Sequence, residues 1–191
     1  MELENNKPIA VLGGVDSGKT NLSIYLARNS GYDKKYLFGY PKKIEGFENI
    51  CDTRALSQIS KCVVVIDELD EIIPLSSRRS ADELKSFLRF IAHNDVKVIF
   101  NTQLSQSITK QISALISCWA VTQMDIHDLK NGSKIKRILT RDLKIPEVIN
   151  RRIGMRLKVG GFVWFDETSD KNSNGVYTFE FQGVGKDWKN V

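Results

Sequence analysis

The segment at residues 13–20 carries the residue types and the spacing of a loop that wraps around a phosphate group. It reads GGVDSGKT and matches the pattern G-x-x-x-x-G-K-[ST]. Glycines allow a tight turn in which successive backbone N–H groups face one anion, and a helix after the turn adds its terminal amides and the positive end of its dipole. The predicted phosphate-binding residues are Gly13, Gly14, Val15, Asp16, Ser17, Gly18, Lys19 and Thr20.

The two residues that end this loop have separate expected roles. The ammonium of Lys19 is expected to neutralise the β- and γ-phosphates of a nucleoside triphosphate and so to assist catalysis. The hydroxyl of Thr20 is expected to ligate Mg²⁺, which keeps most of its water ligands and takes few oxygens from a protein. The loop therefore implies a nucleoside triphosphate and Mg²⁺ as the bound groups.

A second group of reactive side chains follows the apolar run CVVVI at 62–66. Asp67 and Glu68 come directly after it, and open α/β sheets bind ligands at the carboxyl ends of their strands. Asp67 is expected to hold Mg²⁺ through water, and Glu68 to act as general base toward the attacking water. Asp70 and Glu71 extend the acidic run, so an alternative is a set of acids at a helix N-terminus, where negative charge is favourable.

A third polar group follows the apolar run VKVIF at 96–100, where the chain reads Asn101, Thr102 and Gln103. In the usual sheet order, an amide side chain at this point lies beside the first two strands. Gln103 can donate to a γ-phosphate oxygen and accept from a water, so it would report which nucleotide is bound. From the residues alone, an ordinary loop hydrogen bond at a strand end is the simpler interpretation.

The spacing of apolar residues predicts the elements that position these groups. Strands are expected at 9–12, 36–38, 62–66, 96–100 and 118–122, and helices after residue 20, at 53–59, 81–92 and 107–116. Their alternation predicts a mostly parallel α/β sheet flanked by helices. Later strand-like runs, KIKRIL, FVWF and VYTFEF, predict a β-rich C-terminal extension, with a turn at 170–175. One domain is expected over 1–191, with a nucleotide-binding core at 7–122 and a basic extension at 123–191.

The composition excludes disordered, fibrous and membrane-spanning classes. The 191 residues are 41% hydrophobic and 27% charged, and no apolar run approaches the roughly 20 residues of a membrane helix. The N-terminus has no basic stretch followed by an apolar one, and the 3 cysteines are widely separated, which argues against secretion and against a disulfide framework. We expect a cytoplasmic protein without an integral membrane segment.

The positive charge is concentrated in one segment. The net charge is +5, and residues 130–158 hold ten basic residues against Asp142 and Glu147, so the rest of the chain is net acidic. Such a segment is typical of a surface that binds a polyanion such as DNA. A solvated face or a contact between subunits is an equally frequent alternative.

The order of the motifs resembles that of the HerA/FtsK class of P-loop ATPases. GGVDSGKT, VVVIDELDE, an amphipathic helix and VIFNTQLSQSI follow one another over roughly residues 7–122, and in that class the strand after the Asp-Glu pair ends in Thr-Gln, as Thr102 and Gln103 do here. The resemblance implies a RecA-like ATPase fold in which Gln103 takes part in catalysis. Members of the class are ring-forming motors that move double-stranded DNA.

The class also uses an arginine that a neighbouring subunit donates to the active site. Many relatives have an Arg-His pair before the Gln strand, whereas this chain reads Ala92 and His93. Candidate arginines are Arg78, Arg79 and Arg89, with Arg141, Arg151 and Arg152 as competitors. A solvated surface arginine is the alternative for each of them.

The resemblance implies an ATP-driven translocase of double-stranded DNA, of the genome-packaging type found in a virus or mobile element, because the chain is short and has no appended domain. Such a protein would be a DNA-stimulated ATP hydrolase acting as a hexameric ring. Its other partners would be capsid or vertex proteins, in the host cytoplasm or on the virion.

Three alternative functions follow from the same residues. A phage-assembly ATPase similar to zonula-occludens-toxin-type proteins shares the Ile-Asp-Glu and Thr-Gln patterns, although those proteins normally carry a membrane segment. A nucleotide-gated binding module would turn over little ATP, and Glu68 argues against it because a switch needs no base beside the metal. A small-molecule kinase is disfavoured because the chain has no evident arginine-rich lid.

Overall fold

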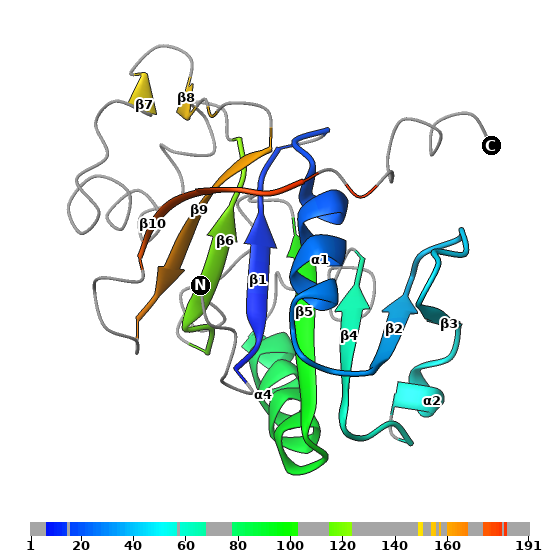
Figure 1. The fold of residues 1–191 in the computed structure, drawn as a ribbon. Coiled ribbons are helices and arrows are strands. Elements are labelled where there is room, and N and C mark those ends of the chain that lie inside the picture. The colour runs from blue at the N-terminus through cyan, green and yellow to red at the C-terminus, as the bar shows by residue number, and fades with distance from the viewer. Residues whose placement is uncertain are drawn as a thin grey trace.

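The computed structural model describes most of the chain. The described residues are 7–14, 16–56, 58–67, 78–102, 115–123, 149–150, 154–155, 157, 160–167, 174–180 and 182. An eight-stranded sheet has the order β10-β9-β6-β1-β5-β4-β2-β3, and a smaller sheet pairs β7 with β8 (Figure 1).

The bounds of the elements are as follows. The strands of the large sheet are β1 Ile9–Leu12, β2 Lys34–Phe38, β3 Glu48–Ile50, β4 Cys62–Ile66, β5 Val96–Thr102, β6 Cys118–Val121, β9 Gly161–Asp166 and β10 Gly175–Thr178. The small sheet consists of β7 Ile149–Asn150 and β8 Gly154–Met155. The described helices are α1 Lys19–Arg28, α2 Thr53–Leu56 and α4 Arg78–His93.

The large sheet is mostly parallel. Every pairing from β3 across β2, β4, β5 and β1 to β6 is parallel, whereas β9 runs antiparallel to β6 and β10 antiparallel to β9. The central parallel strands β1, β4, β5 and β6 are buried along their whole length, and CVVVI in β4 is a continuous apolar run rich in valine. The predicted α/β fold, a mostly parallel sheet flanked by helices, is therefore confirmed.

Helices cover both faces of this sheet. Ile9 and Val11 of β1 pack with Leu22 and Leu26 of α1 in one apolar cluster. Alternate strand residues, such as Ala10 and Leu12, join a second cluster that includes Ile91 of α4. Because successive strand residues face opposite sides, α1 and α4 lie on opposite faces, and the core consists of these two layers.

Most predicted elements match the structure within a few residues. The strands at 9–12 and 62–66 have the predicted bounds, β5 extends two residues further to Thr102, and the helix at 53–59 is the shorter α2. β3 was not predicted, because its three residues carry no periodic pattern. The predicted helix at 107–116 falls mainly outside the described residues, and Leu115 and Ile116 at its end are not helical. The run KIKRIL and most of the predicted turn at 170–175 also lie outside them.

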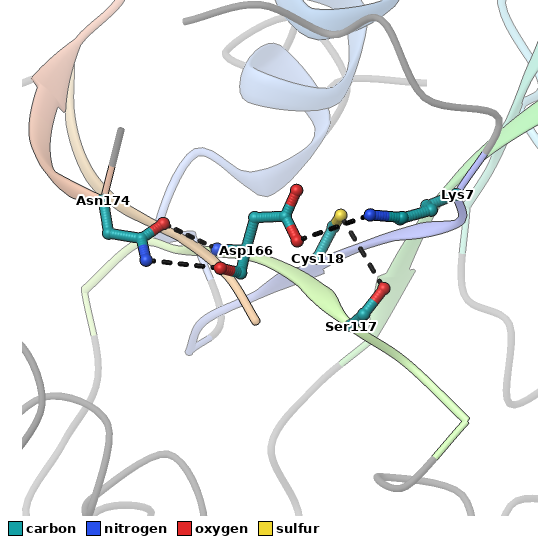
Figure 2. A network of polar contacts seen from close by, with 5 residues as sticks. All are labelled: Lys7, Ser117, Cys118, Asp166 and Asn174. Atoms are coloured by element: carbon teal, nitrogen blue, oxygen red, sulfur yellow. Dashed lines mark hydrogen bonds and ion pairs between the residues drawn. The ribbon is translucent and has the colours of Figure 1, made fainter. Parts of the chain in front are cut away.

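The extension β9–β10 is anchored at the end of the sheet remote from residues 13–20. The Asn174 side chain accepts a hydrogen bond from the Asp166 N–H at 2.8 Å and donates to the Asp166 carbonyl at 3.2 Å (Figure 2). Lys7, just before β1, lies 3.9 Å from the Asp166 carboxylate, and the Cys118 sulfur is near the Ser117 hydroxyl. The Lys7 contact joins the extension to the parallel core, whereas the two hydrogen bonds of Asn174 close the β9–β10 hairpin itself.

Lys97 is buried at the same end of the sheet. Its side chain is 1% exposed, and burial lowers its pKa to about 8, although the nearby Cys118 and Asp166 oppose that shift.

Among the described helices, none combines the length and the apolar character needed to cross a membrane.

Candidate nucleotide-binding site

The predicted phosphate loop joins β1 to α1, as the sequence indicated. Gly18 is the N-cap of α1 and has a left-handed backbone, with φ 86°, and Asp16 also has a positive φ of 57°. The first helical hydrogen bond runs from the Leu22 N–H to the Gly18 carbonyl at 3.0 Å. The positive end of the α1 dipole therefore adjoins the loop, which favours an anion there.

The end of β6 holds the first half of the loop. The Gly14 N–H donates to the Gln123 carbonyl at 2.9 Å. The Thr122 hydroxyl oxygen lies 3.0 Å from the Leu12 carbonyl oxygen and 2.7 Å from the Ser17 hydroxyl oxygen. A Cβ built on Gly13 would overlap both hydroxyl oxygens. Gly13 is thus required because β6 approaches the loop closely.

Lys19 lies over the loop. Its ammonium donates to the Gly14 carbonyl at 2.7 Å and to the Gly13 carbonyl at 3.1 Å. The structure therefore places a positive charge directly beside the backbone that was predicted to surround phosphate. In this position the ammonium is within reach of any anion that the loop binds.

Asp67 meets the start of α1 and the end of β5. The Thr20 hydroxyl donates to Asp67 Oδ1 at 3.5 Å, and the Asn101 amide donates to the same oxygen at 2.5 Å. The Asn101 Oδ1 in turn accepts a hydrogen bond from the Ser23 hydroxyl. A hydroxyl and a carboxylate thus converge beside the loop, and both are the hard oxygen ligands that Mg²⁺ prefers.

The turn after β2 packs against the Asp67 backbone. The Asp67 N–H donates to the Phe38 carbonyl at 3.0 Å. Gly39 has φ 75°, and a Cβ built on it would lie 2.9 Å from the Asp67 carbonyl oxygen. Burial raises the pKa of Tyr40 to about 12, and the Asp67 carboxylate adds to this shift. Tyr40 therefore stays protonated and uncharged beside the site at neutral pH.

The segment after β10 returns to α1 close to the loop, and Figure 1 shows it crossing toward the start of that helix. Phe179 is buried and its ring centroid lies 5.8 Å from that of Tyr25. The Gln182 N–H donates to the Asn21 Oδ1 at 3.1 Å, and its Oε1 accepts from Arg28 at 2.6 Å. The C-terminal extension thus borders the helix that follows the phosphate loop.

The structure brings most of the predicted site residues together. Those placed at the β1–α1 junction or beside it are Gly13, Gly14, Asp16, Ser17, Gly18, Lys19, Thr20 and Asp67. Val15, Glu68 and Gln103 lie outside the described residues, as do Arg141, Arg151 and Arg152. Arg78 and Arg79 begin α4, and Arg89 is exposed on it. The roles assigned to all of these remain predictions.

Sequence reasoning missed Ser23, Asn101 and Thr122. It gave a role at the end of this strand to Gln103, which lies outside the described residues, and gave none to Asn101, whose amide contacts Asp67. The alternation of β5 held a usable signal, because Ile99 and Asn101 lie on the same face of that strand. Thr122 gave no local signal, since its role depends on β6 lying next to β1.

Proteins with a similar fold are found by comparison of structures and not by comparison of sequences. No protein-family model and no curated protein sequence matches the chain. The genome-packaging NTPase B204 of Sulfolobus turreted icosahedral virus 2, in complex with sulfate, is similar with a TM-score of 0.59 at 14% identity, covering 92% of this chain and 97% of that chain. Its complex with ATP-γ-S gives a TM-score of 0.56 at 16% identity, covering 94% of this chain and 98% of that chain.

A cellular protein has a similar fold over part of its length. The EssC protein of Geobacillus thermodenitrificans, in a structure of its ATPases 2 and 3, gives a TM-score of 0.51 at 12% identity. The alignment covers 97% of this chain and 41% of that chain. The chain therefore has the fold of P-loop ATPases such as B204 and EssC.

Proposed function

We propose that the chain is a P-loop ATPase that binds ATP with Mg²⁺ at the β1–α1 junction and hydrolyses it. The observation that carries this proposal is the convergence of three groups at one place. The Lys19 ammonium lies on the loop, and the Thr20 hydroxyl lies 3.5 Å from the Asp67 carboxylate. Cation, hydroxyl and carboxylate at the N-terminus of one helix match the needs of a metal-bound triphosphate.

The chain's own groups would perform most of the work. The loop amides and the α1 dipole bind the phosphates, and the Lys19 ammonium exchanges the carbonyls of Gly13 and Gly14 for phosphate oxygens. Thr20 and Asp67 would hold Mg²⁺, which supplies charge neutralisation of the phosphates when bound. Glu68, the next residue along the chain, would accept a proton from the attacking water, and Gln103 would orient that water.

We further propose that ATP hydrolysis drives movement of double-stranded DNA, in the manner of genome packaging. Two observations support this. The likeness to B204, a viral genome-packaging NTPase, extends over nearly the whole of both chains, and residues 130–158 concentrate basic charge suited to phosphate contacts. The protein would act as a ring, hexameric as in the HerA/FtsK class, in which each site receives an arginine from the neighbouring subunit.

Hydrolysis of ATP with and without duplex DNA tests the enzymatic proposal. We expect turnover to rise with DNA and to fall at least roughly 100-fold in Lys19→Ala, because the charge that stabilises the transferred phosphoryl group is lost. Lys43→Ala removes an exposed lysine outside the loop and should behave like the parent. Unchanged turnover in Lys19→Ala would remove the basis for an ATPase.

Native mass and salt dependence test the motor proposal. A ring that forms with ATP and duplex DNA is expected, and DNA binding should weaken steeply as salt is raised, because phosphate contacts release counterions. A monomer with slow hydrolysis that ignores DNA would favour a nucleotide-gated binding module. Association with host membranes would favour a phage-assembly ATPase.

A further inference from the structure

Two polar side chains are buried beneath the start of α1. Ser23 is 0% exposed and Asn101 is 1% exposed, and the residues around Ser23 on α1 belong to the apolar core. Burying an amide or a hydroxyl is unfavourable unless each finds a hydrogen-bond partner. Their partners therefore indicate what this pair does.

Strand register brings Asn101 beside Asp67. Ile66 of β4 pairs with Phe100 of β5, so the next residue of each strand lies at the same level. On the other side, Asn101 pairs with Val11 of β1, which leads into the phosphate loop. Asn101 thus occupies the position between the strand that enters the loop and the strand that delivers Asp67.

The hydrogen bonds fix the orientation of the Asn101 amide. Its Nδ2 donates to Asp67 Oδ1 at 2.5 Å, while its Oδ1 accepts from the Ser23 hydroxyl. An ionised carboxylate only accepts hydrogen bonds, so the amide nitrogen has to face Asp67. A turned amide would place its oxygen against the carboxylate. It would also face its NH2 group toward the Ser23 hydroxyl, which now donates to the amide oxygen.

These hydrogen bonds connect two residues of α1 to the Asp67 carboxylate. Thr20 and Ser23 are three residues apart, so they lie on one side of the helix, one turn apart. Thr20 contacts Asp67 Oδ1 directly, and Ser23 contacts it through Asn101. The first two turns of α1 therefore reach the same carboxylate oxygen by two routes, one direct and one through Asn101.

We propose that Asn101 is a positioning residue that keeps the Asp67 carboxylate directed at Thr20, and that Ser23 orients the Asn101 amide for this purpose. The inference rests on the proposed binding of Mg²⁺ and ATP at this site. Its consequence is that Asn101 and Ser23 determine how tightly the site holds Mg²⁺, without touching the nucleotide or the loop.

The experiment measures binding rather than turnover. A fluorescent ATP analogue is titrated on the full chain at increasing Mg²⁺, and the Mg²⁺ concentration for half-maximal binding is compared among variants. In Asn101→Leu, which is branched at the same carbon but cannot donate, this concentration should rise roughly 10- to 100-fold, as for other groups that orient a metal ligand. Binding of the analogue in EDTA should stay within about twofold of the parent's.

Ser23→Ala provides a milder variant, since alanine is favourable in a helix. It should shift the Mg²⁺ midpoint in the same direction by a smaller factor, and the double variant should match Asn101→Leu alone, because Ser23 acts through Asn101. Ser30→Ala is the matched control: it removes a hydroxyl that donates to the Ala27 carbonyl at 2.7 Å, and its midpoint should equal the parent's.

The outcomes separate the inference from the proposed function. If the parent binds the analogue in a Mg²⁺-dependent way and both variants keep its midpoint, the positioning role is wrong, even if they melt at a lower temperature. Additive shifts in the double variant would contradict the role given to Ser23. A parent that binds no nucleotide with Mg²⁺ would overturn the proposed function, and the inference with it.

Discussion

At the scale of single residues, the site depends on close approach as much as on charge. Gly13 and Gly39 lie where another part of the chain passes too near for a Cβ, beside Thr122 and beside the Asp67 carbonyl respectively. The pattern of a phosphate loop explains Gly13 by its flexibility alone. The structure adds a steric reason, because the neighbouring strand packs directly on the loop.

Gly13→Ala tests this steric requirement. The new methyl group would overlap the hydroxyl oxygens of Thr122 and Ser17, so the loop has to move, and the affinity for ATP should fall roughly 10- to 100-fold. Fluorescence titration with an ATP analogue measures the change. Gly175→Ala serves as the control, since a Cβ there meets nothing within 4 Å. Parent-like affinity in Gly13→Ala would show that the loop tolerates this displacement.

At the scale of elements, the local sequence pattern predicted the bounds of the strands better than it predicted which distant residues come into contact. The buried strands β1 and β4 have the predicted bounds because continuous apolar runs mark them directly. The contact of Asn101 with Asp67 and that of Thr122 with Ser17 join residues 34 and 105 positions apart. No local pattern encodes such contacts, since they depend on the order of the strands in the sheet.

The β9–β10 hairpin provides a test at this scale. Asn174→Ala removes both hydrogen bonds to the Asp166 backbone, which should lower the free energy of unfolding by about 1–3 kcal/mol. Urea unfolding followed by tryptophan fluorescence reports on it, because Trp164 lies in β9. Asn29→Ala removes an exposed amide that bonds only to the Tyr25 carbonyl among the described contacts, and it should cost less. Equal stability of Asn174→Ala and the parent would show that these two hydrogen bonds do not stabilise the hairpin.

At the scale of the whole molecule, the two ends of the large sheet differ in the surroundings of their charged side chains. At one end, strand ends and α1 gather the Lys19 and Asp67 charges at a site suited to a ligand. At the other end, Lys97 is buried on the face of the sheet that α1 covers, since it lies two residues from Ile99 of that apolar cluster. A buried ammonium lowers stability when it is charged, so stability should depend on pH through Lys97.

The direction of this dependence follows from the pKa values. Lys97 has a pKa of about 8 in the folded chain and 10.5 as its ordinary value, so above pH 8 the unfolded chain binds more protons and stability rises with pH. Burial raises the pKa of Cys62 to about 11 and that of Cys118 to about 12 from an ordinary 9.0. These thiols oppose the rise between pH 8 and 9 and outweigh it above pH 9, because only the unfolded chain loses their protons there.

A comparison of the parent with Lys97→Met between pH 8 and 9 isolates Lys97, because the two thiols contribute equally to both proteins. Lys97→Met keeps the buried length of the side chain without the charge. Across this interval the free energy of unfolding of the parent, measured by urea unfolding, should gain about 1 kcal/mol relative to that of Lys97→Met, since a difference of one bound proton changes stability by about 1.4 kcal/mol per pH unit. Lys85→Met, at an exposed position of α4, should follow the parent. Equal changes in the parent and in Lys97→Met would assign the pH dependence to other groups and would mean that Lys97 is charged in the folded chain throughout this interval.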